Sequence, residues 1–488
     1  MSLGTNSLGV DRARATSHMT ALHKAHATGK YWRAIHCCRE GPSATTPAEA
    51  SGKSSDDGDE DAAAILLDPL RLSRSIDRAY HEASDTLLRI LLGENGLLSS
   101  LRFMKKYFLL DQGDFLVNFL DGAEEELSKD LPSVLRGRVQ NWLSTSIART
   151  ESESSQLASA LRCTFQNKSL RDTLDDLGNR KASKSKRAAR QKKVLTGFEA
   201  IAFEFRSVPF PTSIVLSHDQ LRIYQVLFRL IFFAKHVERQ LVNMWSDHQL
   251  LRGMTSLRSA CSATFSLRRR MLHFIQNYVH YMQFDVVEPG WRALEERLSA
   301  TRDYMEGRTP SAGADGQFPR TVDDLVHDHN EFLIRISHQC LLPNYDLIDR
   351  ASKIMTTCLL FSNQIKLFME TTKVHDLHER TRLERSRLRY GERGEGRGAK
   401  AGDAGVEFRA DRERRTMKCA DRIQDELSTE RYRHMITRFD EVFSAHLAEF
   451  LRNLNSDFGQ KSNAHLTNLF LKLDYNGYCS ETLLTEKK

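Results

Sequence analysis

Two short stretches hold residue types that could bind a phosphate or a metal ion. The first, residues 52–54 (Gly-Lys-Ser), matches the end of a phosphate-binding loop, which also needs a glycine five residues earlier, where this chain has Pro47. No apolar strand precedes it either. The second, residues 327–329 (His-Asp-His), holds metal-ligand types, but side chains two residues apart on a helix point in different directions. We interpret the first stretch as a chance match and the second as a solvated helix face.

Two acidic stretches also fall short of the spacing that their chemistry needs. Residues 474–477 (Asp-Tyr-Asn-Gly) begin like a calcium-binding loop, but Tyr478 stands where the next carboxylate or amide ligand belongs. The run Glu124 to Glu126 is interpreted as an exposed helix face rather than a carboxylate pair for acid–base catalysis. The sequence also has no GxSxG, HExxH, GxGxxG or complete Walker motif. We therefore expect a protein that is not an enzyme, with no catalytic residue, cofactor or metal.

Composition places few further limits on function. The chain has 488 residues, of which 71 are Lys or Arg and 64 are Asp or Glu, giving a net charge of +7 that is too small to indicate nucleic-acid binding by itself. The eight cysteines include no CxxC pair, which favours a reducing compartment. No apolar signal region is visible near the N-terminus, and the longest apolar run, residues 226–234, contains Arg229. We expect a soluble intracellular protein.

The elements that must position any site are mostly helices. The clearest one is predicted from about Ser217 to about His248, with Gln220 completing a capping box and a middle that is apolar nearly all round. Residues 201–205 alternate with a period of two, which predicts a short strand or extended segment. The predicted fold class is all-α, with long-helix bundles, one short β-like segment and several disordered inserts.

The chain divides by composition into four consecutive segments. Residues 1–62 have a disorder composition, and residues 63–177 show helical periodicity. Residues 178–194 are a linker whose core, 179–193, has eight Lys or Arg residues in fifteen and no acidic residue. Residues 195–488 are helical again, with disordered inserts predicted at 303–320 and 384–416.

Several long stretches resemble the gamma-tubulin complex protein family. They read IDRAYHEASDTLLRILL, LSSLRFMKKYFLLDQGDFLVNFLDGAEEEL, LRIYQVLFRLIFFAKHVERQLVNMW, LRRRMLHFIQNYVHYMQFDVVEPGW, HDHNEFLIRISHQC, FDEVFSAHLAEFLRNL and LDYNGY, in the family's order. The resemblance spans about residues 75–478. It identifies residues 195–488 as the family's gamma-tubulin-binding C-terminal domain and residues 63–177 as the end of its N-terminal domain. Residues 1–62 do not resemble the rest of that N-terminal domain, so we expect either a fragment or a chain without it.

The resemblance implies a scaffold that binds gamma-tubulin and helps to template microtubule nucleation. The implied partners are gamma-tubulin, other members of the complex including a component 3-like neighbour, and the microtubule minus end through the complex, with no membrane. The implied location is the cytoplasm and cytoskeleton, at a microtubule-organising centre or spindle pole such as a centrosome or basal body. The alternative is a helical nuclear or nucleic-acid-binding adaptor that uses the basic block 179–193, although that block lacks interleaved aromatic residues. A vesicle tether is a third and more remote reading.

Candidate gamma-tubulin contacts are polar residues on these helices and near the end of the chain, and two further residues, Asp114 and Phe115, chosen for their position beside the chain break at Gly113. Phe228 and Phe232 are interpreted as packing residues, since a central core position cannot touch a partner. For every candidate, an intramolecular salt bridge, cap or inter-helix hydrogen bond is the competing interpretation. The candidates are Asp114, Phe115, Arg222, Lys235, His236, Glu238, Arg239, Asp474 and Asn476.

Overall fold

The computed structural model describes residues 20, 22–36, 69–94, 96–150, 156–168, 170, 173, 195–252, 261–307, 321–371, 430–457 and 464–477. These residues form two compact units that interleave along the chain. Unit 1 comprises Met1–Phe165, Ile201–Phe228 and Val287–Ile336, and unit 2 comprises Gln166–Ala200, Arg229–Val286 and Ser337–Lys488. The sequence analysis divided the chain into consecutive segments instead, and the domain boundaries proposed there stay predictions.

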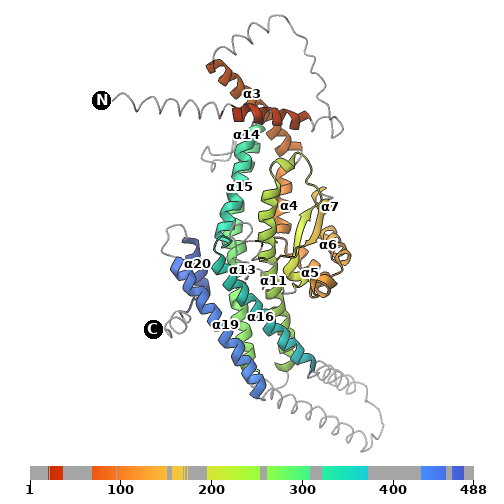
Figure 1. Cartoon of the computed structure of the whole chain (residues 1–488), viewed down its shortest axis with the longest axis vertical. Coiled ribbons are helices and arrows are strands. Elements are labelled where there is room, and N and C mark those ends of the chain that lie inside the picture. Colours follow the sequence, from red (N-terminus) through yellow and green to blue (C-terminus); the bar gives the residue numbers. More distant parts are fainter. Residues whose placement is uncertain are drawn as a thin grey trace, which may run out of the picture. The chain divides into compact units, whose positions relative to one another are not determined.

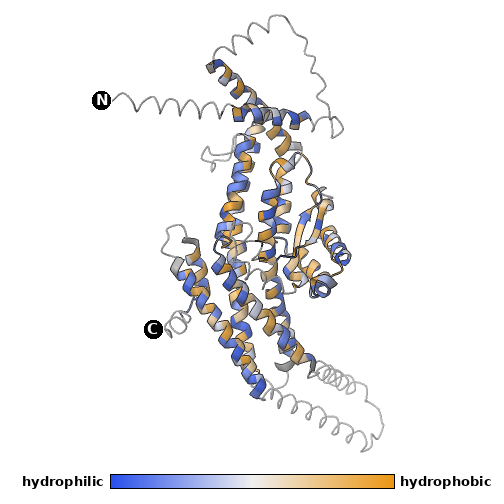
Figure 2. Ribbon diagram, viewed as in Figure 1, coloured by the Kyte–Doolittle hydropathy of each residue, from blue (hydrophilic) through white to orange (hydrophobic). Residues whose placement is uncertain are grey.

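Unit 1 is built from helices and a short two-stranded antiparallel sheet (Figure 1). Figure 2 shows hydrophobic and hydrophilic residues alternating along the helices of this unit, which is the pattern expected of helices that bury one face. In chain order its helices after residue 68 are α3 (Pro69–Arg89), η1 (Ile90–Glu94), α4 (Leu97–Phe108), α5 (Gly113–Leu127), η2 (Leu131–Ser133), α6 (Arg136–Thr150), α7 (Gln156–Ala160), η3 (Thr212–Ile214), the N-terminal part of α11 (His218–Arg252), α14 (Glu288–Met305) and most of α15 (Val322–Gln339).

The sheet of unit 1 pairs β1 (Leu161–Phe165) with β2 (Ile201–Phe205), antiparallel, with Cys163 opposite Phe203. The strand expected at 201–205 is thereby confirmed. Phe203 stacks on Phe228 with ring centroids 4.1 Å apart, and Phe108 lies 6.0 Å from Phe203. Fully burying a Phe contributes about 1.5–3 kcal/mol, so this aromatic cluster is a main source of stability for the unit.

Unit 2 is a set of long helices packed along one another (Figure 1). Helix α19 packs on α16, α13 and α20, and α13 also packs on α20. On α19, Phe443, Phe450 and Leu454 are buried, whereas Val442 is exposed. The helices of the unit are α10 (Gly197–Ala200), the C-terminal part of α11 (His218–Arg252), α13 (Ser262–His280), η4 (Tyr281–Val287), α16 (Tyr345–Thr371), α19 (Glu430–Asp457) and α20 (Ala464–Leu473).

The long apolar helix predicted from Ser217 is confirmed as α11. The backbone N–H of Ser217 donates to Oε1 of Gln220 at 2.6 Å, which is one half of the predicted capping box. Residues 226–234 are all buried, including Arg229. Phe228 and Phe232 are core residues, as expected.

The disorder prediction for residues 1–62 is wrong for residues 22–36, which form a helix. This helix buries Tyr31, whose hydroxyl donates to Asp323 at 2.5 Å, and Lys24 pairs with Asp77 at 2.6 Å. The residues around this helix are small and polar, so the composition of the segment predicts disorder. The helix nevertheless has an apolar face, which is buried only through tertiary contacts. The remaining residues of 1–62, apart from residue 20, lie outside the described part of the chain.

Two prolines lie beside helix boundaries. Pro132 lies in the short 3-10 turn η2, and α6 begins after it, at Arg136. Pro289 lies in the first turn of α14, which follows directly on the π-helical turn η4. Proline is tolerated there since the first-turn N–H groups have no intrahelical acceptor.

The predicted inserts and linker can be assessed only in part. Residues 303–305 are the last residues of α14 rather than part of a disordered insert. Residues 308–320, 384–416 and the basic block 179–193 lie outside the described residues. No helix in the described ranges is long and apolar enough to cross a membrane.

Candidate functional site

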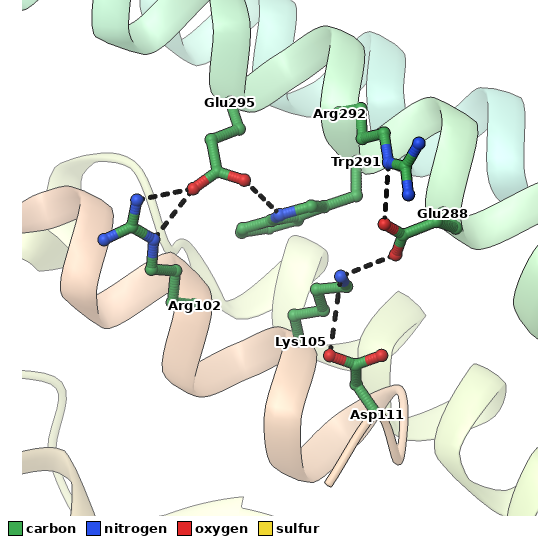
Figure 3. A network of polar contacts seen from close by, with 7 residues as sticks. All are labelled: Arg102, Lys105, Asp111, Glu288, Trp291, Arg292 and Glu295. Atoms are coloured by element: carbon green, nitrogen blue, oxygen red, sulfur yellow. Dashed lines mark hydrogen bonds and ion pairs between the residues drawn. The ribbon is translucent and has the colours of Figure 1, made fainter.

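A network of charged residues joins α4 to α14 within unit 1 (Figure 3). Lys105 on α4 is nearly buried, and its ammonium lies 2.7 Å from Oε2 of Glu288 and 3.4 Å from Oδ2 of Asp111. Arg102, one turn earlier, donates two hydrogen bonds to Oε1 of Glu295, at 2.8 and 2.6 Å. Hydrogen bonding from Lys105, with a further contribution from Arg292, lowers the pKa of Glu288, so this carboxylate stays ionised.

Trp291 and Gly290 complete the network on α14. The indole N–H of Trp291 donates to Oε2 of Glu295 at 2.9 Å, and the ammonium of Lys105 lies 5.6 Å from the centre of its ring. A Cβ built on Gly290 would lie 3.3 Å from Ile336 and 3.4 Å from Phe332, so α15 approaches α14 closely at this point. The stretch VVEPGW, prominent in the resemblance, is therefore an architectural element that fixes α14 on α4 and α15.

The candidate residues of unit 1 divide into exposed and buried ones. Asp114 and Arg222 are exposed and remain open to a partner. Phe115 is fully buried, stacked on Phe119 with ring centroids 5.9 Å apart and edge-on to Tyr107 at 4.7 Å. Phe115 is therefore corrected to a core residue, because a side chain without exposed surface cannot contact another protein.

The candidates on α11 in unit 2 lie within two turns of one another. Lys235 and Glu238 are half-buried and pair at 3.2 Å, and Arg239 is half-buried beside them. His236 is buried and stacks on Phe198 at 3.5 Å between ring centroids, and its burial lowers the pKa to about 3. His236 is thus a neutral packing residue and is withdrawn as a contact.

The C-terminal candidates belong to the turn after α20. Asp474 is buried, and its carbonyl accepts the N–H of Gly477 at 3.1 Å, so it shapes the turn. Asn476 and Tyr475 are exposed. Of this pair of candidates, only Asn476 keeps a surface that a partner could reach.

Two polar residues differ from the interpretations given above. His329 is buried rather than solvated, with Nε2 lying 3.1 Å from the hydroxyl of Tyr224, and its burial lowers the pKa to about 4. Glu126 is also buried rather than exposed, and it accepts hydrogen bonds from Lys129 and Arg138 at 2.8 and 2.9 Å. Within the described ranges, no group of three or more His, Cys, Asp or Glu residues could hold a metal ion.

Sequence reasoning missed an exposed group where η4 meets α20. Phe284 is exposed and stacks on His280 at 4.8 Å between ring centroids. Lys472 of α20 lies 3.3 Å from Nδ1 of His280 and 2.5 Å from Oδ2 of Asp285. The signal that could have found it is Phe284 itself, which lies off the apolar stripe formed by Phe274, Tyr278 and Met282.

Comparisons with known proteins add a family match over most of the chain. The family model described as "Gamma tubulin complex component C-terminal" matches residues 97–478, starting upstream of residue 195, where the sequence analysis placed that domain. The chain is similar to gamma-tubulin complex component 2 of Mus musculus, with 29% identity over 84% of this chain and 42% of the relative. It is similar to gamma-tubulin complex component 2 of Arabidopsis thaliana, with 34% identity over 58% of this chain and 39% of the relative.

A third similar protein is the spindle pole body component alp4 of Schizosaccharomyces pombe, with 25% identity over 71% of this chain and 47% of the relative. The chain therefore spans less than half the length of each of these relatives. The likeness to component 2 agrees with the amino-acid sequences of the KHVERQL and RRRMLHFIQN stretches, which resemble that member of the family more than component 3.

Proposed function

This chain belongs to the gamma-tubulin complex component family, and on that premise we propose that it is a scaffold that binds gamma-tubulin and helps to template microtubule nucleation. The observation that carries the proposal is the family match over residues 97–478, which includes almost every described helix of both units. The relatives are named as components of the gamma-tubulin complex and of the spindle pole body. We propose the same complex and a microtubule-organising centre as the location of this chain, with a component 3-like protein as its neighbour.

The physical role of such a scaffold is to order its partner in advance. Assembling a new filament from free subunits costs translational and rotational entropy for each subunit that is fixed. A rigid helical protein that holds one gamma-tubulin removes part of that cost from nucleation. The charged network around Lys105 and Glu288 supports this role, because its ion pairs join α14 to α4.

The proposed contact residues are the candidates that keep accessible surface. They are Asp114 and Arg222 in unit 1, and Lys235, Glu238, Arg239 and Asn476 in unit 2. Polar residues of this kind determine specificity and association rate more than affinity. We therefore expect single substitutions among them to weaken binding modestly.

A pull-down separates this function from the adaptor alternative. The immobilised full chain is compared with a variant lacking residues 179–193, with purified gamma-tubulin and a single-stranded oligonucleotide as separate prey. The scaffold proposal predicts that both chains retain gamma-tubulin and that neither depends on the oligonucleotide. Retention of the oligonucleotide by the full chain alone, with gamma-tubulin retained by neither, would favour the adaptor.

A further inference from the structure

The N-terminal helix 22–36 is held on the rest of unit 1 by few apolar contacts. A helix of this length is only marginally stable by itself, and Gly29 near its middle lowers its helix propensity further. The helix therefore depends on its docking site, but the apolar surface that it buries there is small, because two of its four buried apolar residues are alanines. These four are Ala27, Tyr31, Ala34 and Ile35.

One carboxylate makes the main polar contact of this docking. Asp323, in the first turn of α15, accepts a hydrogen bond from the hydroxyl of Tyr31 at 2.5 Å and another from the hydroxyl of Tyr80 on α3 at 2.7 Å. The two tyrosine rings lie 5.9 Å apart. The ion pair of Lys24 with Asp77 is partly exposed, so it contributes little. Removal of the Tyr31 hydroxyl should therefore weaken docking while leaving the ring in place.

The outer surface of the helix carries an indole beside free cations. Trp32 is 46% exposed although it is large and mostly apolar. Lys30 and Arg33 are exposed, one turn apart, and neither pairs with a carboxylate among the described residues. Residues 22–36 include no Asp or Glu at all. The helix is thus basic, with an aromatic side chain at the edge of its docked face.

Helical spacing separates the apolar residues of this helix from the basic ones. At about 100° per residue, Tyr31, Trp32 and Ile35 fall within one arc of about 100°, and Lys30 and Arg33 fall outside it. A basic helix with aromatic and aliphatic side chains on its other face is typical of helices that lie in the surface of an anionic bilayer. In the docked helix, Tyr31 and Ile35 are buried within unit 1, so the whole apolar arc becomes available only when the helix leaves α3 and α15.

The surrounding sequence favours a lipid surface over other acidic partners. Residues 1–36 contain five Lys or Arg residues and one acidic residue. Cys37 and Cys38 follow the helix directly, and cysteines beside an amphipathic helix are typical sites of reversible S-palmitoylation. Nucleic acid is disfavoured, because a single exposed indole offers only one platform for base stacking.

We propose that helix 22–36 binds the surface of an anionic lipid bilayer, and that its docking on α3 and α15 competes with this binding. The same apolar face serves in both states, so the docked helix is the form that is off the bilayer. The inference goes beyond the proposed function and does not rest on it. The sequence analysis expected no membrane partner, since it assigned residues 1–62 to disorder and recognised no amphipathic helix there.

The test measures flotation of the purified full chain with vesicles of phosphatidylcholine, made with and without phosphatidylserine. Trp32→Ala and Lys30→Glu should each weaken binding to the anionic vesicles about tenfold. Tyr31→Phe keeps the ring but loses the hydrogen bond to Asp323, so it should bind about threefold to tenfold more tightly than the unchanged chain. The controls Leu367→Ala and Lys366→Glu, which change exposed residues of α16, should leave binding unchanged.

The opposite effects expected for Tyr31→Phe and Trp32→Ala make the test specific. If neither the unchanged chain nor Tyr31→Phe floats with the anionic vesicles, the inference is wrong. If the chain floats but Trp32→Ala and Lys30→Glu match the controls, another part of the chain is responsible and helix 22–36 is not the site. Equal binding by Tyr31→Phe and the unchanged chain would refute the competition with docking. Retention of a single-stranded oligonucleotide in place of vesicles would show that the class of partner is wrong.

Discussion

Replacing Arg229 with methionine should destabilise unit 2 through its buried hydrogen bonds. The guanidinium of Arg229 is buried in the middle of α11, and Nη1 donates to Oε1 of Gln166 at 2.9 Å and to the hydroxyl of Thr173 at 3.0 Å. Its Nη2 donates to the carbonyls of Lys168 and Glu199, both at 2.8 Å. One side chain thus holds the chain on both sides of residues 174–194 against α11.

The magnitude follows from these four acceptors. Methionine fills a similar volume but donates nothing, and each buried acceptor left without a donor costs about 1–3 kcal/mol. Water can reach part of the segment, since Lys168 is exposed, so the lower end of that range applies to each acceptor. We expect a loss of about 3–5 kcal/mol in the free energy of unfolding, and a smaller loss for Arg229→Lys, which keeps the charge but not the planar fork.

Urea denaturation followed by circular dichroism measures this loss. Arg222→Met is the matched control, because Arg222 is exposed on the same helix, and it should change stability by less than about 0.5 kcal/mol. Trypsin should also cut the Lys- and Arg-rich block 179–193 faster in Arg229→Met, since its flanking anchors are released. Equal denaturation midpoints for Arg229→Met and the unchanged chain would refute the reasoning.

Three further perturbations test other parts of the structure by chemical denaturation. Lys105→Met should cost about 1–2 kcal/mol at pH 7, and because Lys105 lowers the pKa of Glu288, the difference should shrink as pH falls below the ordinary Glu pKa of 4.5. The pKa of His329 is about 4 in the folded chain and 6.5 when unfolded, so the unfolded state binds the proton first and stability should fall as pH drops from 6.5 towards 4, less so in His329→Gln. Gly122→Ala would place a Cβ 2.3 Å from the ring of Trp142, so it should displace this half-exposed indole, cost about 1–3 kcal/mol and shift the tryptophan emission.

Gly122→Ala has a matched control variant, and the two electrostatic predictions each have an outcome that would contradict them. Gly137→Ala, on α6 with nothing within 4 Å of the added Cβ, should not destabilise the chain. A Lys105→Met loss that is constant from pH 7 to pH 4, or an identical pH profile for His329→Gln and the unchanged chain, would contradict the corresponding electrostatic argument.

Local periodicity was enough to predict the long elements of this fold. Helix α11 and the strand at Ile201 to Phe205 follow from apolar spacing, because each buries one continuous stretch. Strand β1 has the same length and the same period of two at Leu161, Cys163 and Phe165, but only Leu161 of its residues is buried, so its apolar pattern is weaker than that of β2. The helix at 22–36 was not predicted because the contacts that hold it are tertiary. Its residues bond to Asp77 on α3 and to Asp323 on α15, which sequence spacing does not reveal.

Candidate contacts were harder to predict, because exposure is a tertiary property. His236 was chosen as a candidate contact for its polarity, but the ring of Phe198 stacks on it. Phe115 was chosen for its position in the chain, but it packs against Tyr107 and Phe119. Phe284 was missed because a π-helical turn shifts the register, so counting with a period of 3.6 assigns the wrong face. Burial of polar groups such as Glu126 likewise depends on donors, here Lys129 and Arg138, that sequence spacing alone does not bring together.

Sedimentation velocity of the purified chain titrated with gamma-tubulin tests the central claim most directly. The account predicts a complex containing one chain and one gamma-tubulin, formed at micromolar concentrations or below. A chain that is folded by circular dichroism, yet sediments independently of gamma-tubulin throughout that range, would contradict it.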